Sequence, residues 1–121
     1  LGVLVACGDG GSAAGSASAK PTFSSVPTND VTVQATDSAC QLSSSTLTAG
    51  KVTVTATSSA GGETEVYLYG QENGNYTKIM GEVEGLTSGL TKAFTADVPA
   101  GTYELVCKSD GKELRVPVTA K

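Results

Sequence analysis

Apolar and polar residues alternate with a period of two along most of the chain after residue 30. The clearest example is Lys51–Thr57, where Val52, Val54 and Ala56 share one face and threonines occupy the other. This is the period of a β-strand with one buried face, and it differs from the 3.6-residue period of a helix. The pattern predicts strands over 31–36, 51–57, 64–69, 76–83, 91–98, 102–107 and 113–119.

Glycine and proline interrupt this alternation at positions where turns are expected, such as 61–62, 99–101 and 110–111. Roughly seven or eight short strands at this spacing are typical of a β-sandwich or a Greek-key barrel. Pro117 cannot donate a backbone hydrogen bond, so the last strand is expected at a sheet edge or with a gap in its ladder. The fold class predicted from the pattern is therefore all-β, as a small Greek-key β-sandwich.

Composition limits the size of the folded part. Glycine, alanine and serine dominate the first thirty residues, which leaves residues 30–121 as the packed domain. The chain has four Tyr, two Phe and no Trp, so the core must consist mainly of smaller aliphatic side chains. A domain of this size buries only about 60–65 % of its unfolded surface, so a covalent or metal cross-link would stabilise it noticeably.

Charge and residue content exclude several function classes. The net charge is −4 and the eight basic residues form no stripe, which argues against nucleic-acid binding. The chain contains no histidine, so it offers no Ser-His-Asp or Cys-His arrangement and no imidazole metal ligand. Glu82 and Glu84 are two residues apart on a strand and point the same way, unlike the carboxylates of a glycosidase. We expect a protein that is not an enzyme.

The N-terminus predicts export and membrane attachment. Residues 1–7 form an apolar run that ends in Cys7 and is too short to span a bilayer. Leu4–Cys7 resembles a bacterial lipobox, which implies a signal-peptide remnant and lipidation of Cys7. Residues 8–29 are rich in Gly, Ser and Ala and are expected to form a disordered, flexible tether with a span of roughly 25 Å. The predicted location is the extracytoplasmic side of the cell envelope, with the lipid anchor as the membrane contact.

Cys40 and Cys107 are the candidate functional residues of the folded part. Cys107 lies at the end of the predicted strand 102–107, and Cys40 opens a strand pair expected beside it. Two thiols that meet in a sandwich outside the cytosol form either a disulfide or a pair of soft metal ligands. The sequence leaves both alternatives open.

Several phrases occur together in order: VTVQATDSAC from Val31, LTAGKV from Leu47, TEVYLY from Thr64, GEVEGL from Gly81 and VPAGTYELVC from Val98. Over residues 30–121 the chain resembles the N-terminal cupredoxin-like domain of the EfeO-type iron-uptake lipoproteins. The resemblance implies a cupredoxin-like fold, a copper or iron ion, and partners in a ferrous-iron uptake system. The positions that it implies as metal ligands are Cys40, Glu65, Glu82, Glu84 and Cys107.

The chain departs from that family and from blue-copper proteins. It ends at Lys121, before the family's helical domain, which leaves open whether it is the N-terminal piece of a longer polypeptide. The loop Lys108–Lys112 lacks the acidic or methionine-containing pattern often seen there, and no histidine follows Cys107 to complete a blue-copper centre. Two hypotheses follow: a tethered, non-catalytic metal-binding domain in support of iron uptake, or a disulfide-closed structural or protein-interaction sandwich without metal.

Overall fold

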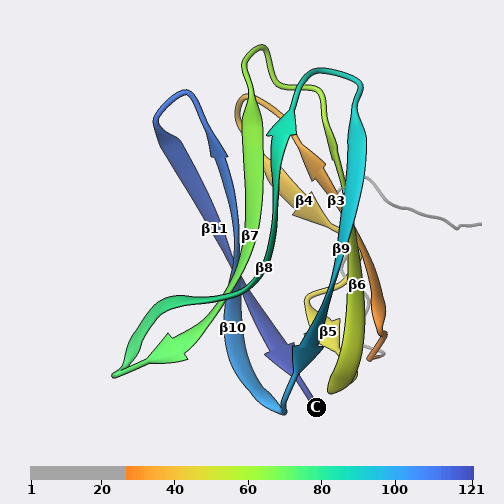
Figure 1. Ribbon diagram of the computed structural model, residues 1–121, viewed down its shortest axis with the longest axis vertical. Helices are drawn as coiled ribbons and strands as arrows, with labels where there is room; N and C mark the ends of the chain where they lie inside the picture. Colours follow the sequence, from red (N-terminus) through yellow and green to blue (C-terminus); the bar gives the residue numbers. More distant parts are fainter. Residues whose placement is uncertain (1–26) are drawn as a thin grey trace, which may run out of the picture.

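The computed structural model describes residues 27–121, and β-strands make up most of this part of the chain (Figure 1). The predicted lipobox with Cys7 and nearly all of the predicted tether 8–29 lie outside the described residues. Over residues 27–121 no helix is long and apolar enough to cross a membrane.

The strands form two sheets that pack face to face. The first sheet has the order β5 (Thr46–Leu47), β11 (Lys112–Ala120), β10 (Gly101–Ser109), β7 (Thr64–Glu72) and β8 (Asn75–Leu86). The second has the order β4 (Cys40–Leu42), β3 (Asp30–Ala35), β6 (Gly50–Ser58) and β9 (Thr91–Val98). The pairs β3–β6 and β5–β11 are parallel and the others antiparallel. This confirms the predicted all-β sandwich.

The core lies between the two sheets and uses the alternate positions that the sequence predicts. In β6, Val52, Val54 and Ala56 are fully buried while the threonines between them are partly exposed. Each strand thus removes one row of aliphatic side chains from water. This burial stabilises the fold by about 25 cal/mol per Å² of apolar surface. The largest fully buried side chains are Leu47, Leu68, Leu86 and Leu105.

Two hairpins connect neighbouring strands of the first sheet through tight turns. Asn73 and Gly74 have φ values of 54° and 83° between β7 and β8, and Asp110 and Gly111 have values of 50° and 79° between β10 and β11. Two successive positive φ angles match the twist of antiparallel strands and favour Asn, Asp and Gly. The β7–β8 hairpin bends away from the sandwich near its tip (Figure 1), where register shifts interrupt its ladder.

The last strand lies at the edge of the first sheet over most of its length. Its outer partner β5 pairs only with Thr119 and Ala120, so Pro117 faces no outer partner strand. This agrees with the position predicted for Pro117. At the other end of the domain's sequence, pairing begins slightly before the predicted boundary at residue 30. Thr28 forms an isolated bridge with Leu47, and the Asn29 carbonyl accepts a hydrogen bond from Thr53.

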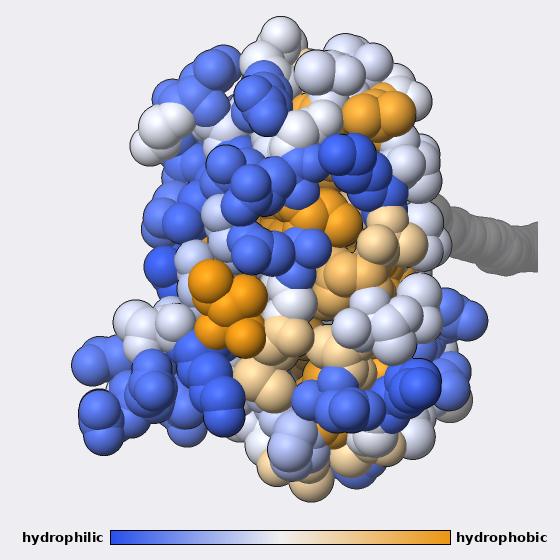
Figure 2. Space-filling view, viewed as in Figure 1, coloured by the Kyte–Doolittle hydropathy of each residue, from blue (hydrophilic) through white to orange (hydrophobic). Residues whose placement is uncertain are grey.

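The two sheets approach each other closely where β8 meets β9. A Cβ atom on Gly81 would lie 2.3 Å from the ring of Phe94, so this position needs a glycine for the ring to pack over the strand. Figure 2 shows apolar surface along this seam with hydrophilic residues on both sides. Ile79 and Leu90 are the large hydrophobic residues that stay most exposed in the described part of the chain, at 50 % and 40 %.

Candidate functional site

The five predicted ligands fall into two groups on opposite faces of the first sheet. The cysteines lie in the core between the sheets, and the three glutamates lie on the outer face that no second sheet covers.

Cys40 and Cys107 form a disulfide across the core, with their Sγ atoms 2.07 Å apart. Cys40 opens β4 in one sheet and Cys107 lies in β10 of the other, so the bond joins the two layers. The two strands thus face each other across the sandwich, and the two thiols meet inside it as predicted. The exposed fractions of the residues are 9 % and 3 %, which places the bond inside the hydrophobic core.

Strand alternation separates the cysteines from the glutamates. Cys107 is paired with Val66, and both side chains point into the core. The next pair along the same ladder is Lys108 with Glu65, whose side chains therefore point outward. Glu82 is paired with Tyr67 and joins Glu65 on the outer face. A metal ion bound between the two sulfur atoms could not also contact these carboxylates.

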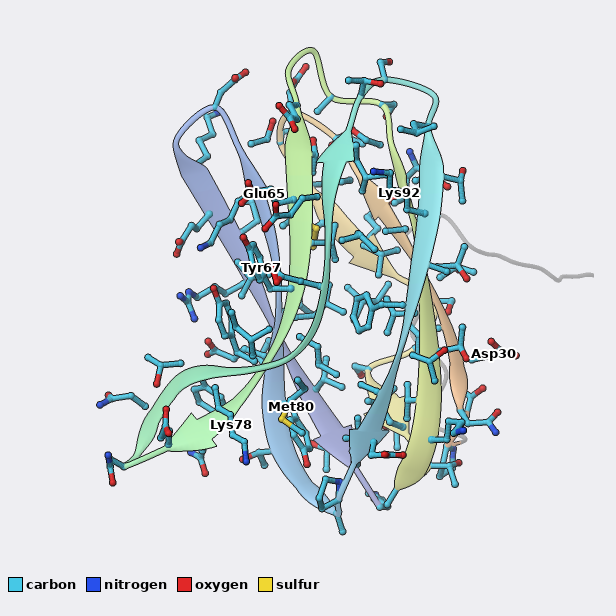
Figure 3. All side chains as sticks on the ribbon, viewed as in Figure 1. Asp30, Glu65, Tyr67, Lys78, Met80 and Lys92 are labelled. Atoms are coloured by element: carbon cyan, nitrogen blue, oxygen red, sulfur yellow. A yellow bond between two sulfur atoms is a disulfide. The ribbon has the colours of Figure 1, made fainter. Side chains whose placement is uncertain are left out.

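The outer face carries an acidic cluster formed by Glu65, Glu82 and Glu84 around the hydroxyl of Tyr67. This hydroxyl donates to Glu65 Oε1 at 2.8 Å and lies 3.4 Å from Glu84 Oε2. Figure 3 shows Glu65 and Tyr67 next to each other on this side of the sheet. The sequence-predicted glutamates are thus brought together, and Tyr67 is a member that the sequence analysis did not select.

Electrostatics in the acidic cluster favour the protonated forms of Tyr67 and Glu82. The pKa of Tyr67 is raised far above its ordinary value because its hydroxyl donates to Glu65 and because burial and the nearby carboxylates oppose the phenolate. The pKa of Glu82 is also raised, first through loss of water contact and then through the neighbouring carboxyl of Glu84. Lys108 acts in the opposite direction on Glu82, but its effect is smaller than that of the causes that raise the pKa.

Two stacked tyrosines and two cations complete the outer face. The rings of Tyr67 and Tyr69 are 5.3 Å apart and nearly parallel, and Val106 is fully buried beside them. Lys108 Nζ lies 4.6 Å from the centre of the Tyr67 ring, and the Arg115 guanidinium lies 5.5 Å from that of Tyr69. Positions of this kind favour cation–π attraction. Sequence reasoning missed both cations because their placement depends on the β10–β11 register.

Ion pairs hold the two cations over the rings. Lys108 Nζ lies 3.3 Å from Glu113 Oε2, and Arg115 contacts Glu104 at 2.7 Å and Glu113 at 3.2 Å. These contacts lower the pKa of Glu113, mainly through Arg115 and then through Lys108. A surface pocket of about 290 Å³ lies beside them and has Glu65, Lys108 and Glu113 in its lining. The outer face is thus acidic on one side and charge-paired on the other.

Chemically, the outer face carries oxygen donors and the core carries two bonded sulfur atoms. In the part of the chain that the structure describes, no group of three or more Cys, Asp or Glu side chains is placed to hold a metal ion. The two sulfur atoms are bonded to each other, whereas a metal is bound by the thiolate. The acidic cluster presents oxygen donors, which suit hard cations such as iron better than Cu(I).

Comparison with solved structures shows the fold. The chain is similar to dithionite-reduced auracyanin from the photosynthetic bacterium Roseiflexus castenholzii, with a TM-score of 0.63 over 79 % of this chain and 99 % of that chain. The identity is 13 %, so the likeness concerns the fold alone, which is cupredoxin-like. No protein-family model and no curated protein sequence matches the chain. The resemblance to EfeO-type lipoproteins therefore remains a prediction beyond this fold.

Proposed function

We propose that this chain is a non-catalytic, extracytoplasmic binding module whose cupredoxin-like sandwich is closed by a structural disulfide and held at the membrane through lipidated Cys7. The observation that carries the proposal is the Cys40–Cys107 bond between the two sheets. A bond of this kind persists in an oxidising compartment and not in the cytosol. It therefore supports an exported domain.

The side chains available as metal ligands support a binding role more than electron transfer. A blue-copper centre needs a thiolate and two imidazoles, but the chain has no histidine and the thiols of Cys40 and Cys107 are bonded to each other. The covered tyrosines and charged rim of the outer face offer a surface for a partner protein. In this proposal the disulfide stabilises the domain while that face makes contacts.

A second candidate is the binding of a metal ion in support of iron uptake, and the acidic cluster favours it. Glu65, Glu82 and Glu84 share one face, and the pKa of Glu82 is raised first by loss of water contact, then by the Glu84 carboxyl and by charge repulsion from Glu84 and Glu65. A cation would relieve that repulsion after the exposed Glu82 and Glu84 side chains turn toward Glu65. Iron fits these oxygen donors, and components of a ferrous-iron uptake system would then be the partners.

Metal titration of the full chain in its oxidised and reduced states separates the two candidates. The structural-module proposal expects no stoichiometric uptake of Fe²⁺, Fe³⁺ or Cu⁺ by the oxidised protein in native mass spectrometry. The metal-binding candidate expects one iron ion, lost in the triple variant Glu65→Gln, Glu82→Gln, Glu84→Gln and retained in the control Glu72→Gln. Glu72 lies near the hairpin tip, away from the acidic cluster.

Thiol labelling in cells tests the disulfide itself. The proposal expects that Cys40 and Cys107 are protected from alkylation in the exported protein until a reductant is added to the unfolded chain. Free Cys40 and Cys107 together with stoichiometric Cu⁺ would overturn it in favour of a thiolate site. For the anchor, Cys7→Ser should move the protein from the membrane fraction to the soluble extracytoplasmic fraction.

A further inference from the structure

Met80, the only methionine of the chain, lies at the base of the projecting β7–β8 hairpin. Its side chain is partly buried and packs against the edge of the core. A Cβ atom on Gly70 would lie 3.1 Å from Met80 Sδ and 3.3 Å from the Tyr103 ring. Because Gly70 carries no side chain, the sulfur atom of Met80 has room to lie close to the backbone of β7.

An open pocket gives solvent access to this site. The pocket has a volume of about 210 Å³, and Met80, Tyr103, Pro99 and Lys78 are among its lining residues. The Tyr103 hydroxyl donates to the Pro99 carbonyl, which holds the ring beside the thioether. Figure 3 shows Met80 and Lys78 together at the base of the hairpin. A small oxidant can therefore reach the side chain without unfolding of the domain.

The other sulfur atoms of the described domain are in a different state. Cys40 and Cys107 are bonded to each other and buried, with exposed fractions of 9 % and 3 %. Over residues 27–121, the thioether of Met80 is thus the sulfur group that is not already part of a disulfide. It also borders a pocket. An exported domain meets peroxides and hypohalous acids directly, and methionine is a common target of both.

We propose that Met80 is an oxidation site, at which a hydroperoxide converts the thioether of the folded protein to methionine sulfoxide. A lone pair on Sδ forms the new S–O bond while the O–O bond of the hydroperoxide breaks. The sulfur loses two electrons, the hydroperoxide gains them, and water leaves when the oxidant is hydrogen peroxide. Reduction by a methionine sulfoxide reductase would restore the thioether.

Lys78 provides a donor for the new oxygen atom. It lines the same pocket as Met80, and in the described part of the chain it takes part in no ion pair. Its ammonium group can donate a hydrogen bond to the sulfoxide oxygen in place of water. Oxidation then changes the base of the hairpin from an apolar contact to a polar one while the fold persists.

Peroxide treatment of the full chain tests the proposal. Limited exposure to hydrogen peroxide should add one oxygen atom to the peptide that contains Met80, as located by mass spectrometry. The rate in the folded protein should lie within about tenfold of the rate in urea, because an open pocket needs no global unfolding. A rate in the folded protein more than about a hundredfold slower would overturn the proposal, because oxidation would then require unfolding.

Two variants control this experiment. Met80→Leu keeps a similar apolar volume, and its thermal midpoint should not change on peroxide treatment; a change equal to that of the wild type would place the oxidation elsewhere. Lys78→Gln should lower the thermal midpoint of the oxidised protein more than that of the untreated protein. An equal effect on both forms would contradict the role given to the ammonium group.

Discussion

The two faces of the first sheet bury side chains by different means. On the inner face, Val66 and Leu68 pack against a second sheet and lie beside the Cys40–Cys107 bond. On the outer face, Val106 is fully buried and each of the two tyrosines is 8 % exposed, but side chains such as Lys108 and Arg115 cover this face in place of a second sheet. The inner face is covered by another β-sheet, whereas the outer face is covered by a layer of long polar side chains.

This difference teaches that burial alone does not locate the core of a thin sandwich. The inner face is fixed by a covalent bond and by aliphatic packing, and the outer face by ion pairs and ring contacts that water can loosen. We expect the inner face to determine global stability. The outer face should instead respond to pH, salt and binding partners.

Loss of the disulfide should have the largest effect on this comparison. The bond closes a loop with a sequence separation of 67 residues. In the chain-entropy model this is worth about 4 kcal/mol, so the double variant Cys40→Ala, Cys107→Ala should lose about that much free energy of unfolding. Chemical denaturation at fixed pH measures the change, and Cys7→Ser provides the matched control. A loss below about 1 kcal/mol would show that packing, not the bond, holds the inner face.

A matched pair of valines compares the two covers directly. Val66 and Val106 are both fully buried, the first on the inner face and the second on the outer face. Val66→Ala should cost about 2 kcal/mol, because the rigid core leaves a cavity. Val106→Ala should cost about 1 kcal/mol, since Lys108 and Arg115 can move into the space. Equal losses in denaturant titrations would mean that the outer cover is as rigid as a second sheet.

The smallest expected effect is the opposite pH response of two glutamates on the outer face. The pKa of Glu82 is raised by loss of water contact and by Glu84, so its contribution to stability declines as pH rises above about 4.3, the ordinary glutamate value. The pKa of Glu113 is lowered by Arg115 and Lys108, so its contribution is present above that pH and is lost in acid.

These directions predict different outcomes for the two amide variants. Relative to the wild type, Glu82→Gln should gain thermal stability at neutral pH, and Glu113→Gln should lose it. Both differences should fade in acid, where the carboxyl groups of the wild type become protonated. Thermal midpoints measured across the acid range at constant ionic strength would reveal this. Differences of the same sign would refute the separation of the outer face into an acidic and a charge-paired side.

Much of the fold could be predicted from the alternation of side chains, because each strand carries its own inward and outward positions. Val52, Val54 and Ala56 were expected on one face, and they are buried there. Glu65 was also expected opposite Val66 and Leu68, where it lies. These are properties of single strands, which the local sequence contains.

The candidate site was harder to predict because it depends on register between strands. That Lys108 lies beside Glu65 while Cys107 lies beside Val66 follows from the β7–β10 pairing, which no local pattern specifies. Glu82 is paired with Tyr67, and a register shift between Thr64 and Val66 in the β7–β8 ladder changes the position of Glu84. The resemblance grouped the cysteines with the glutamates, but only the pairing reveals that the sheet lies between them.

The position of the disulfide also constrains how the protein matures. Cys40 comes early in the domain and Cys107 comes in its next-to-last strand, so the bond must wait until nearly the whole domain has been synthesised. Once both layers have closed, the sulfur atoms are shielded from any oxidoreductase. The sulfur atoms are therefore expected to join before the two layers close fully, which ties correct assembly to the order in which folding and oxidation occur.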